Sequence, residues 1–232
     1  NQLANSTLRV IAAQYQAGLR SFMQGRQAAV AQSLDWVRLP PTSGQYGRLR
    51  RMPAFERQLV MIDTSLSFVA GISVLDLNNR YVASSVGSAI DEASMEEVAR
   101  YHLVPGQPIL TPRHTAHYYR AVARTDPPVF SYYLPLEVIS KPERVVLQMD
   151  VSAHALEAPL ELDGSRVFSW VALIDGGRVL ASSGTEDLAM GHDVVFEIPG
   201  TPWLLAAQTD LPTLAAAETT VRLVAIARAA MT

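Results

Sequence analysis

The chain has 232 residues, of which 49% are hydrophobic and 18% are charged, and its net charge is −3 at pH 7. This composition is typical of a chain that folds around an apolar core. The charge balance argues against a nucleic-acid-binding protein, because such proteins carry a concentrated basic surface. The chain contains no cysteine, which excludes disulfides, thiolate metal sites and cysteine nucleophiles.

The first part of the chain predicts one long amphipathic helix. Residues 7–39 contain no proline, and Pro40-Pro41 then ends the pattern. Apolar residues recur at helical spacings, namely Leu8, Ile11, Tyr15, Leu19, Phe22, Val30, Leu34 and Val37. About thirty residues at 1.5 Å each give a helix roughly 45–50 Å long, which exceeds the usual globular length. We expect its later half to pack on the chain and its first turns to meet a partner helix in a homodimer.

A second helix and a β-hairpin are predicted next. Residues 54–67 have helical periodicity, whereas residues 69–76 are β-branched and apolar. A pair of asparagines then gives a turn signal, and residues 80–85 resume as a strand, which is the pattern of a hairpin. Ser94 and Glu97 have the spacing of a capping box, so we expect another helix after the hairpin.

The middle of the chain is expected to complete an antiparallel sheet. Residues 117–124, 129–136 and 144–151 are three extended runs, and proline-containing turns separate them. Together with the hairpin they give about five strands, with one helix inserted between the second and the third.

The last part of the chain predicts a second, smaller sheet. Residues 168–174, 178–183, 193–198 and 203–208 form four short extended runs with glycine-containing turns between them. Residues 211–231 are apolar and rich in alanine, which predicts a terminal helix.

One short pattern occurs twice, as VLDLNNRYVASS and as VALIDGGRVLASS. The offset that aligns Ser84 with Ser182 also aligns Arg80 with Arg178. We interpret the repeat as a hairpin that opens each of the two sheets. Its Ser-Ser pair could line a pocket, or it could end the strand by bonding to the local backbone. Both copies carry the pair and only one sheet is expected to bind a ligand, which favours the structural role.

Four segments resemble the double Cache family, the tandem PAS-like extracytoplasmic sensor domains of two-pass bacterial receptors. VLDLNNRYVASS and ALIDGGRVLASS are similar to its recurring hairpin, and SYYLPLE and RVVLQMDVS are similar to the last two strands of its membrane-distal sheet. The resemblance implies an α+β fold with a long N-terminal helix, two PAS-like antiparallel sheets and a C-terminal helix. The implied parts are the N-terminal helix and loop (1–53), the distal subdomain (54–158), the proximal subdomain (159–210) and a helix that leads to a membrane span (211–232).

The same resemblance implies a function and a location. The chain would be the periplasmic, extracytoplasmic domain of an inner-membrane receptor, and both of its ends would continue into the membrane. The distal sheet would bind a small molecule, and the proximal sheet would relay the change to the terminal helices. The receptor's output would be a histidine kinase, a diguanylate cyclase or phosphodiesterase, or a chemotaxis module. No cofactor is implied.

The expected ligand site lies between Arg113 and Asp150, in strands that the second copy of the repeat lacks. An anionic or zwitterionic ligand needs placed donors and acceptors in an apolar cup. The candidates are Arg113, His117, Tyr118, Tyr119, Arg120, Tyr132 and Asp150. Because strand side chains alternate, only every second residue of 117–120 can face the cup. The alternative is that the tyrosines belong to the core and the arginines are solvated. The Arg-x-x-x-Trp-Tyr motif of some amino-acid-sensing members of the family is not present.

Other classes of function are also considered. A ligand-free dimerisation or protein-interaction module would fill the cup with its own side chains. A metal site would require His114 and His117 to converge with further ligands, such as Asp126 or Asp150. The motifs of serine hydrolases, zinc proteases and P-loop enzymes are not found, so no catalytic residue and no metal ligand is assigned.

Overall fold

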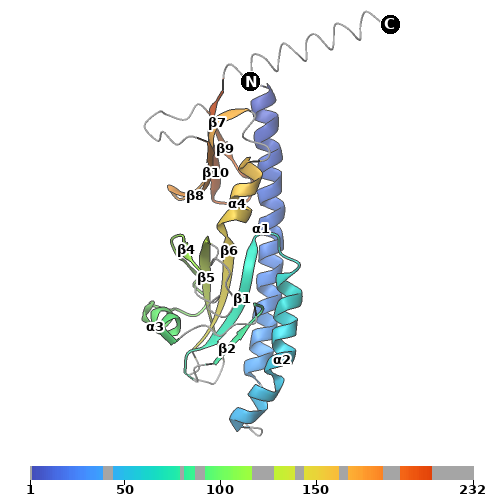
Figure 1. Cartoon of the computed structure of the whole chain (residues 1–232), viewed down its shortest axis with the longest axis vertical. Coiled ribbons are helices and arrows are strands. Elements are labelled where there is room, and N and C mark those ends of the chain that lie inside the picture. The colour runs from blue at the N-terminus through green and yellow to red at the C-terminus, as the bar shows by residue number, and fades with distance from the viewer. Residues whose placement is uncertain are drawn as a thin grey trace, which may run out of the picture. The chain divides into compact units, whose positions relative to one another are not determined.

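The computed structural model describes residues 2–38, 44–78, 81–86, 92–116, 128–138, 144–161, 167–184 and 194–210. The chain divides into two compact units. The larger unit is Gly18–Ala155, and the smaller unit joins Asn1–Ala17 to Leu156–Thr232. Helix α1 (Gln2–Val37) therefore contributes residues to both units (Figure 1). The subdomain boundaries expected from the sequence stay a prediction.

The larger unit contains an antiparallel sheet in the order β2-β1-β6-β5-β3, with β4 also paired to β5. Its strands are β1 (Val69–Asp76), β2 (Tyr81–Ser84), β3 (Ile109–Leu110), β4 (His114–Thr115), β5 (Pro128–Leu136) and β6 (Val145–Ser152). The predicted hairpin is confirmed as β1 and β2, and the last two predicted strands are confirmed as β5 and β6. The strand expected at residues 117–124 lies outside the described residues.

The smaller unit contains an antiparallel sheet in the order β8-β7-β10-β9. Its strands are β7 (Phe168–Asp175), β8 (Arg178–Gly184), β9 (Val194–Glu197) and β10 (Trp203–Thr209), so the four predicted strands are confirmed. This order is the same as that of β2-β1-β6-β5. The repeat in the sequence is therefore a repeat of a whole sheet topology. The helix expected at residues 211–231 lies outside the described residues.

Three further helices are α2 (Gly44–Asp63), α3 (Glu92–Arg100) and α4 (Ala153–Pro159). The sequence predicted the first of these helices at residues 54–67, but α2 begins earlier and contains Pro53. The helix with a capping box is confirmed as α3, although it begins at Glu92, before the expected cap. Helix α4 was not predicted from the sequence.

The two repeated hairpins turn in different ways. In the smaller unit Asp175 pairs with Arg178, and Gly176 and Gly177 have φ angles of 52° and 85°. Positive φ at both central residues is the requirement of a type I′ turn, and glycine meets it without steric cost. In the larger unit Asp76 pairs instead with Tyr81, so that connection is longer.

The Ser-Ser pair of the first hairpin is bonded within the fold. The Ser73 hydroxyl donates to the Ser84 hydroxyl at 3.0 Å, across the pair of strands. The Ser85 hydroxyl accepts from the Ile72 amide at 2.9 Å and donates to Oδ2 of Asp63 at 2.9 Å. These contacts join the hairpin to the end of α2, which supports the structural interpretation of the pair.

Asp63 should make the stability of the chain depend on pH. Burial raises the pKa of its carboxyl group and the charge of Asp150 raises it further, while the Ser85 hydrogen bond lowers it. The net shift is upward, so the folded chain favours the protonated form, and stability falls as pH rises from the unfolded to the folded pKa. We expect Asp63→Asn to raise the melting temperature near neutral pH, and this gain should shrink as the buffer is acidified. Melting curves between about pH 3 and 8 test this, with the exposed Asp35→Asn as control. A gain that does not change with pH would contradict it.

Each face of the larger sheet packs against different helices. Ile72, Val74, Leu147 and Met149 face α1 and α2, where they form one core with residues such as Leu59. On the other face, a second core packs against α3 and contains Leu75, Met95, Val98, Val129, Tyr133 and Val146. Figure 1 shows α1 and α2 on one side of β1 and β6, and α3 on the other. The face toward α3 also carries the polar residues described below.

The first turns of α1 pack within their own chain. Leu8, Ile11 and Tyr15 are fully buried, and the Tyr15 hydroxyl donates to the Leu156 carbonyl at 2.5 Å. This part of the apolar stripe therefore packs within the chain, against α4 and the smaller sheet, and the expected contact of the first turns with a partner helix stays a prediction. The apolar residues that α1 does expose are Leu3, Val10 and Met23. Homodimerisation itself stays a prediction.

Candidate functional site

Besides Ser73 and Ser84, which bond to each other, four polar side chains are buried at the face of the larger sheet that packs against α3. Thr111, Ser131, Gln148 and Asp150 are each at most 7% exposed. Burying polar groups is unfavourable unless they are hydrogen-bonded, and burying a carboxylate is more so. A group of them on one face of a sheet therefore needs a local explanation.

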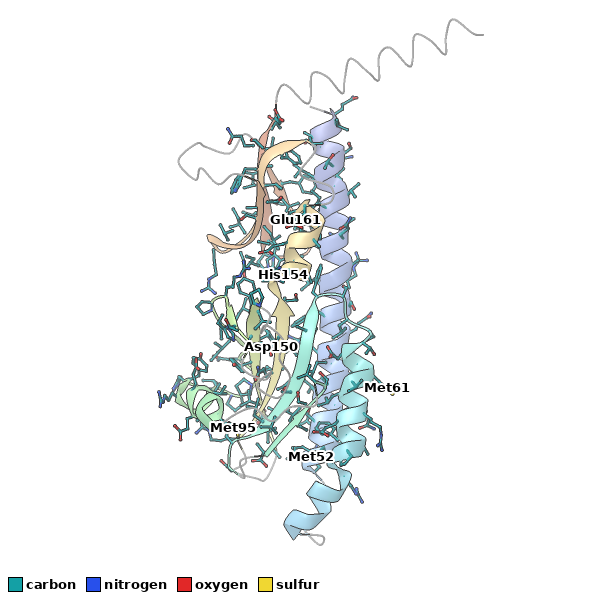
Figure 2. The ribbon with its side chains drawn as sticks, viewed as in Figure 1. Met52, Met61, Met95, Asp150, His154 and Glu161 are labelled. Carbon is teal, nitrogen blue, oxygen red and sulfur yellow. The ribbon has the colours of Figure 1, made fainter. Side chains whose placement is uncertain are left out.

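Strand register brings three of these residues together. Ser131 pairs with Asp150, and Tyr133 pairs with Gln148. Because side chains alternate along a strand, both of these pairs lie on one face of the sheet. The intervening pair, Tyr132 and Met149, lies on the other face. Figure 2 places Asp150 on β6. The polar group thus interrupts a strand that is otherwise apolar, VVLQMDVS.

Hydrogen bonds within the group account for its burial. The Gln148 amide nitrogen donates to both oxygens of Asp150, at 3.1 and 3.0 Å. The Ser131 hydroxyl donates to Oδ1 of Asp150 in a short hydrogen bond. On its other side, the Ser131 oxygen lies 3.1 Å from Nε2 of His114. We call these residues, together with Thr111, the polar cluster.

An irregular edge of the sheet joins the polar cluster to the surface. Leu110 pairs with Tyr132 and His114 pairs with Val129, so three residues, Thr111–Arg113, lie opposite two on β5. An extra residue on one strand is the arrangement of a β-bulge, which commonly re-aims a side chain beside a functional site. The Thr111 amide donates to the Ser131 carbonyl at 3.0 Å, and the Thr111 hydroxyl accepts from the Ser131 amide at 2.9 Å. In a regular pair of strands a backbone carbonyl would accept from the Ser131 amide, and at the bulge the Thr111 hydroxyl takes its place.

A pocket of about 180 Å³ lies above the polar cluster, between α3 and the bulge. It is lined by Glu97, Tyr101, Thr111, Pro112, Arg113, His114 and Tyr133. The Tyr101 hydroxyl donates to Glu97 at 3.2 Å, and its ring lies 5.7 Å from that of Tyr133. The pocket therefore presents one cationic group, one anionic group and two aromatic walls.

The two tyrosines of the pocket remain neutral donors. Burial raises the pKa of Tyr133, and the nearby charge of Asp150 raises it further. Burial also raises the pKa of Tyr101, with Glu97 as a second cause. Since both shifts are upward from a value that is already alkaline, each hydroxyl keeps its proton at physiological pH.

Two larger hollows lie between α1 and α2, with volumes of about 390 and 310 Å³. The first is lined by small and apolar residues such as Gly25, Ala28 and Leu66, and the second by residues that include Trp36 and Phe55. Neither lies over a buried hydrogen-bonded cluster. We therefore regard the smaller pocket beside α3 as the candidate site.

The structure brings some of the predicted site residues together and separates others. Arg113 lines the pocket, and Asp150 lies beneath it in the polar cluster. Tyr132 lies on the opposite face of the sheet, where its hydroxyl accepts from Arg26 at 2.9 Å and its ring packs edge-on against Phe22 at 5.3 Å. Residues 117–120, which include the other four candidates, lie outside the described residues.

Several residues of the site were not predicted from the sequence: Glu97, Tyr101, Thr111, Ser131 and Gln148. One signal could have found part of the set, because Gln148 and Asp150 alternate in an apolar strand and must share a buried face. His114 was named as a candidate metal ligand. Within the part of the chain that the structure describes, no three histidine or carboxylate side chains converge as a metal site would require.

The fold matches that of solved receptor domains. The ligand-binding domain of the Pseudomonas fluorescens chemoreceptor CtaA, solved with L-serine, aligns with a TM-score of 0.56 at 12% identity, over 87% of this chain and 93% of that one. The extracellular domain of rpHK1S-Z16, a protein named as a histidine kinase, aligns with a TM-score of 0.57 at 13% identity, over 90% and 94%. The ligand-binding domain of the Campylobacter jejuni chemoreceptor Tlp3, solved with 4-methylisoleucine, aligns with a TM-score of 0.52 at 15% identity, over 92% and 94%.

No protein-family model matches the chain, and no curated protein matches it in sequence. At 12 to 15% identity the solved structures show a common fold. Each of them is covered almost completely, so the likeness includes both sheets and the long helix. The chain therefore has the α+β fold of the extracellular ligand-binding domains of chemoreceptors and histidine kinases, which is the fold that its resemblance to the double Cache family implied.

Proposed function

We propose that the chain is the extracytoplasmic sensor domain of a bacterial membrane receptor, and that it binds a small polar molecule in the pocket between α3 and the bulge. The observation that carries this proposal is the placement of Arg113 and Glu97 over the hydrogen-bonded polar cluster. A pocket with a few oriented polar groups and aromatic walls is the usual form of a small-molecule site. The fold of receptor sensor domains supports the same assignment.

The chemistry of the pocket indicates the class of ligand. A guanidinium group such as that of Arg113 binds a carboxylate through two parallel hydrogen bonds. Glu97 can accept from an ammonium or a hydroxyl group, and Tyr133 supplies an apolar wall with a polar tip. A volume of about 180 Å³ is below the range of drug-sized sites, so the ligand has few non-hydrogen atoms. An anionic or zwitterionic metabolite meets these requirements.

The rest of the receptor follows from the same proposal. We place the chain in the periplasm as part of an inner-membrane protein whose cytoplasmic output is a kinase, a cyclic-dinucleotide enzyme or a chemotaxis module. The fragment itself would bind rather than catalyse. None of the described helices combines the length and the apolar character that crossing a membrane requires.

Arg113 provides the test of the ligand site. A thermal-shift screen of amino acids and small carboxylic acids should find compounds that stabilise the chain, and titration calorimetry should then give their affinity. Arg113→Gln should weaken binding about tenfold, because a hydrogen bond to a charged group contributes about 1.5 kcal/mol or more. Arg57→Gln, which changes an exposed arginine on α2, is the matched control and should leave affinity unchanged. Equal binding by the wild type and Arg113→Gln would contradict the proposed site.

A second candidate function is a ligand-free module that acts by dimerisation. The apolar residues exposed on α1, Leu3, Val10 and Met23, favour a partner surface there. Light scattering on the purified chain measures its oligomeric state. A dimer together with a negative ligand screen would favour this candidate, whereas a monomer that binds a metabolite would exclude it.

A further inference from the structure

The hydrogen bonds of the polar cluster take their directions from Asp150, which accepts from the Gln148 amide nitrogen at both of its oxygens, as an acceptor-only carboxylate does. The Ser131 hydroxyl must therefore donate its single proton to Asp150. It can then only accept from His114, so the proton of the neutral imidazole lies on Nε2.

The other nitrogen of His114 faces the bulge. Nδ1 lies 3.2 Å from the Thr111 hydroxyl and 3.1 Å from the Pro112 carbonyl. In the tautomer that carries its proton on Nε2, Nδ1 is an acceptor and takes the proton of Thr111, so its approach to the Pro112 carbonyl, which is also an acceptor, is a contact and not a hydrogen bond. The Thr111 oxygen in turn accepts from the Ser131 amide. The hydrogen bonds thus begin and end on Ser131, and they run through both sides of the imidazole.

From these directions we infer that Ser131 and Asp150 are positioning residues of the ligand site: they hold His114 as the Nε2-protonated tautomer, and His114 holds the bulge Thr111–Arg113. Asp150 is 1% exposed and does not line the pocket, so it acts through Ser131 and His114. Arg113 lies between Pro112, whose carbonyl contacts the imidazole, and His114, which carries the imidazole. Its backbone position therefore depends on this network.

This inference rests on the proposed function only for the role of Arg113, and its test needs no ligand. The chain is labelled with ¹⁵N-histidine, and long-range ¹H–¹⁵N spectra at about pH 8, where imidazole is ordinarily neutral, report which ring nitrogen carries the proton. His114→Gln assigns the signal. The wild type should show one tautomer, protonated on Nε2, and Ser131→Ala should give a mixture of both. Ser131→Thr keeps the hydroxyl and should restore the single tautomer.

Hydrogen exchange measures the second half of the inference. In Ser131→Ala and Asp150→Asn, the amides of residues 109–116 should exchange about tenfold faster, which corresponds to the loss of one hydrogen bond to a charged group. The strand β1 should keep its protection, and Ser169→Ala, which changes an exposed serine of β7, should alter neither segment.

Three results would overturn the inference. They are a wild-type His114 protonated on Nδ1, a Ser131→Ala chain that keeps the single tautomer, and unchanged exchange in residues 109–116. If the ligand screen fails but the tautomer and the exchange rates are as expected, the proposed function is removed and the network stays in place.

Discussion

Replacing Tyr15 by alanine is expected to lower the free energy of unfolding of the smaller unit by about 3–5 kcal/mol, the usual cost of removing a buried aromatic side chain. Tyr15 is fully buried, and its ring meets that of Trp203 edge-on at 6.3 Å. Its hydroxyl donates to the Leu156 carbonyl, so the side chain connects α1 with α4 and with the smaller sheet. Burial raises the pKa of this hydroxyl, which therefore remains a donor at every physiological pH.

Tyr15→Phe separates the two contributions. It keeps the ring and loses only the hydrogen bond, so it should cost about 1 kcal/mol, although the unpaired carbonyl of Leu156 can increase this. Urea unfolding followed by tryptophan fluorescence and circular dichroism gives both values. A Tyr15→Ala chain as stable as Tyr15→Phe would show that the ring contributes little to the smaller unit.

Gly18→Ala is the second substitution with a large expected effect, a net destabilisation of about 0.5–2 kcal/mol. A Cβ atom at Gly18 would lie 1.9 Å from Cε2 of Phe68 and 2.4 Å from its Cδ2. Atoms cannot approach this closely, so the Phe68 ring must leave a site in which it is 8% exposed. Exposing a buried phenylalanine costs about 1.5–3 kcal/mol. Alanine is otherwise the better helix former by about 1 kcal/mol, which reduces the net loss.

A double-mutant cycle tests this explanation by a change of sign. In a Phe68→Ala background the clash is absent, so Gly18→Ala should there stabilise the chain by up to about 1 kcal/mol. Gly25 provides the comparison, because its Cβ would lie 2.6 Å from Cδ1 of Leu66, the flexible end of a side chain. Gly25→Ala should therefore cost less than Gly18→Ala. Destabilisation by Gly18→Ala in both backgrounds would contradict the assigned cause.

The sequence predicted those parts of the fold that have a local pattern. The strands β1 and β7 are mainly apolar runs followed by turn residues, so their local pattern identifies them without any tertiary information. Helix α4 has only seven residues and contains Pro159, which is too short for a periodic signal. The strands β3 and β4 have two residues each and exist only because β5 lies beside them. Such elements depend on contacts between segments that are distant in sequence.

The candidate site was predictable only in part, for a similar reason. Arg113 and Asp150 were expected because cations and carboxylates are common in ligand sites. The residues that connect them, Ser131 and His114, meet only through the register of β5 with β6 and through the bulge, neither of which the spacing of residues determines. Gly18 illustrates the same limit, because the sequence shows only a glycine within a helical pattern, whereas in the structure the Phe68 ring occupies the space beside it.

The alternation along β5 and β6 has a consequence for engineering new specificities. Odd positions of β5 and even positions of β6 face α3 and the pocket, whereas Leu134, Leu147 and Met149 pack on α1 and α2. Of the first set Tyr133 lines the pocket, so a library at Tyr133 would vary the lining and leave the side that packs on α1 and α2 unaltered. Biosensor variants with new ligands could then be selected from one scaffold, because stability and recognition are encoded by interleaved residues of the same two strands.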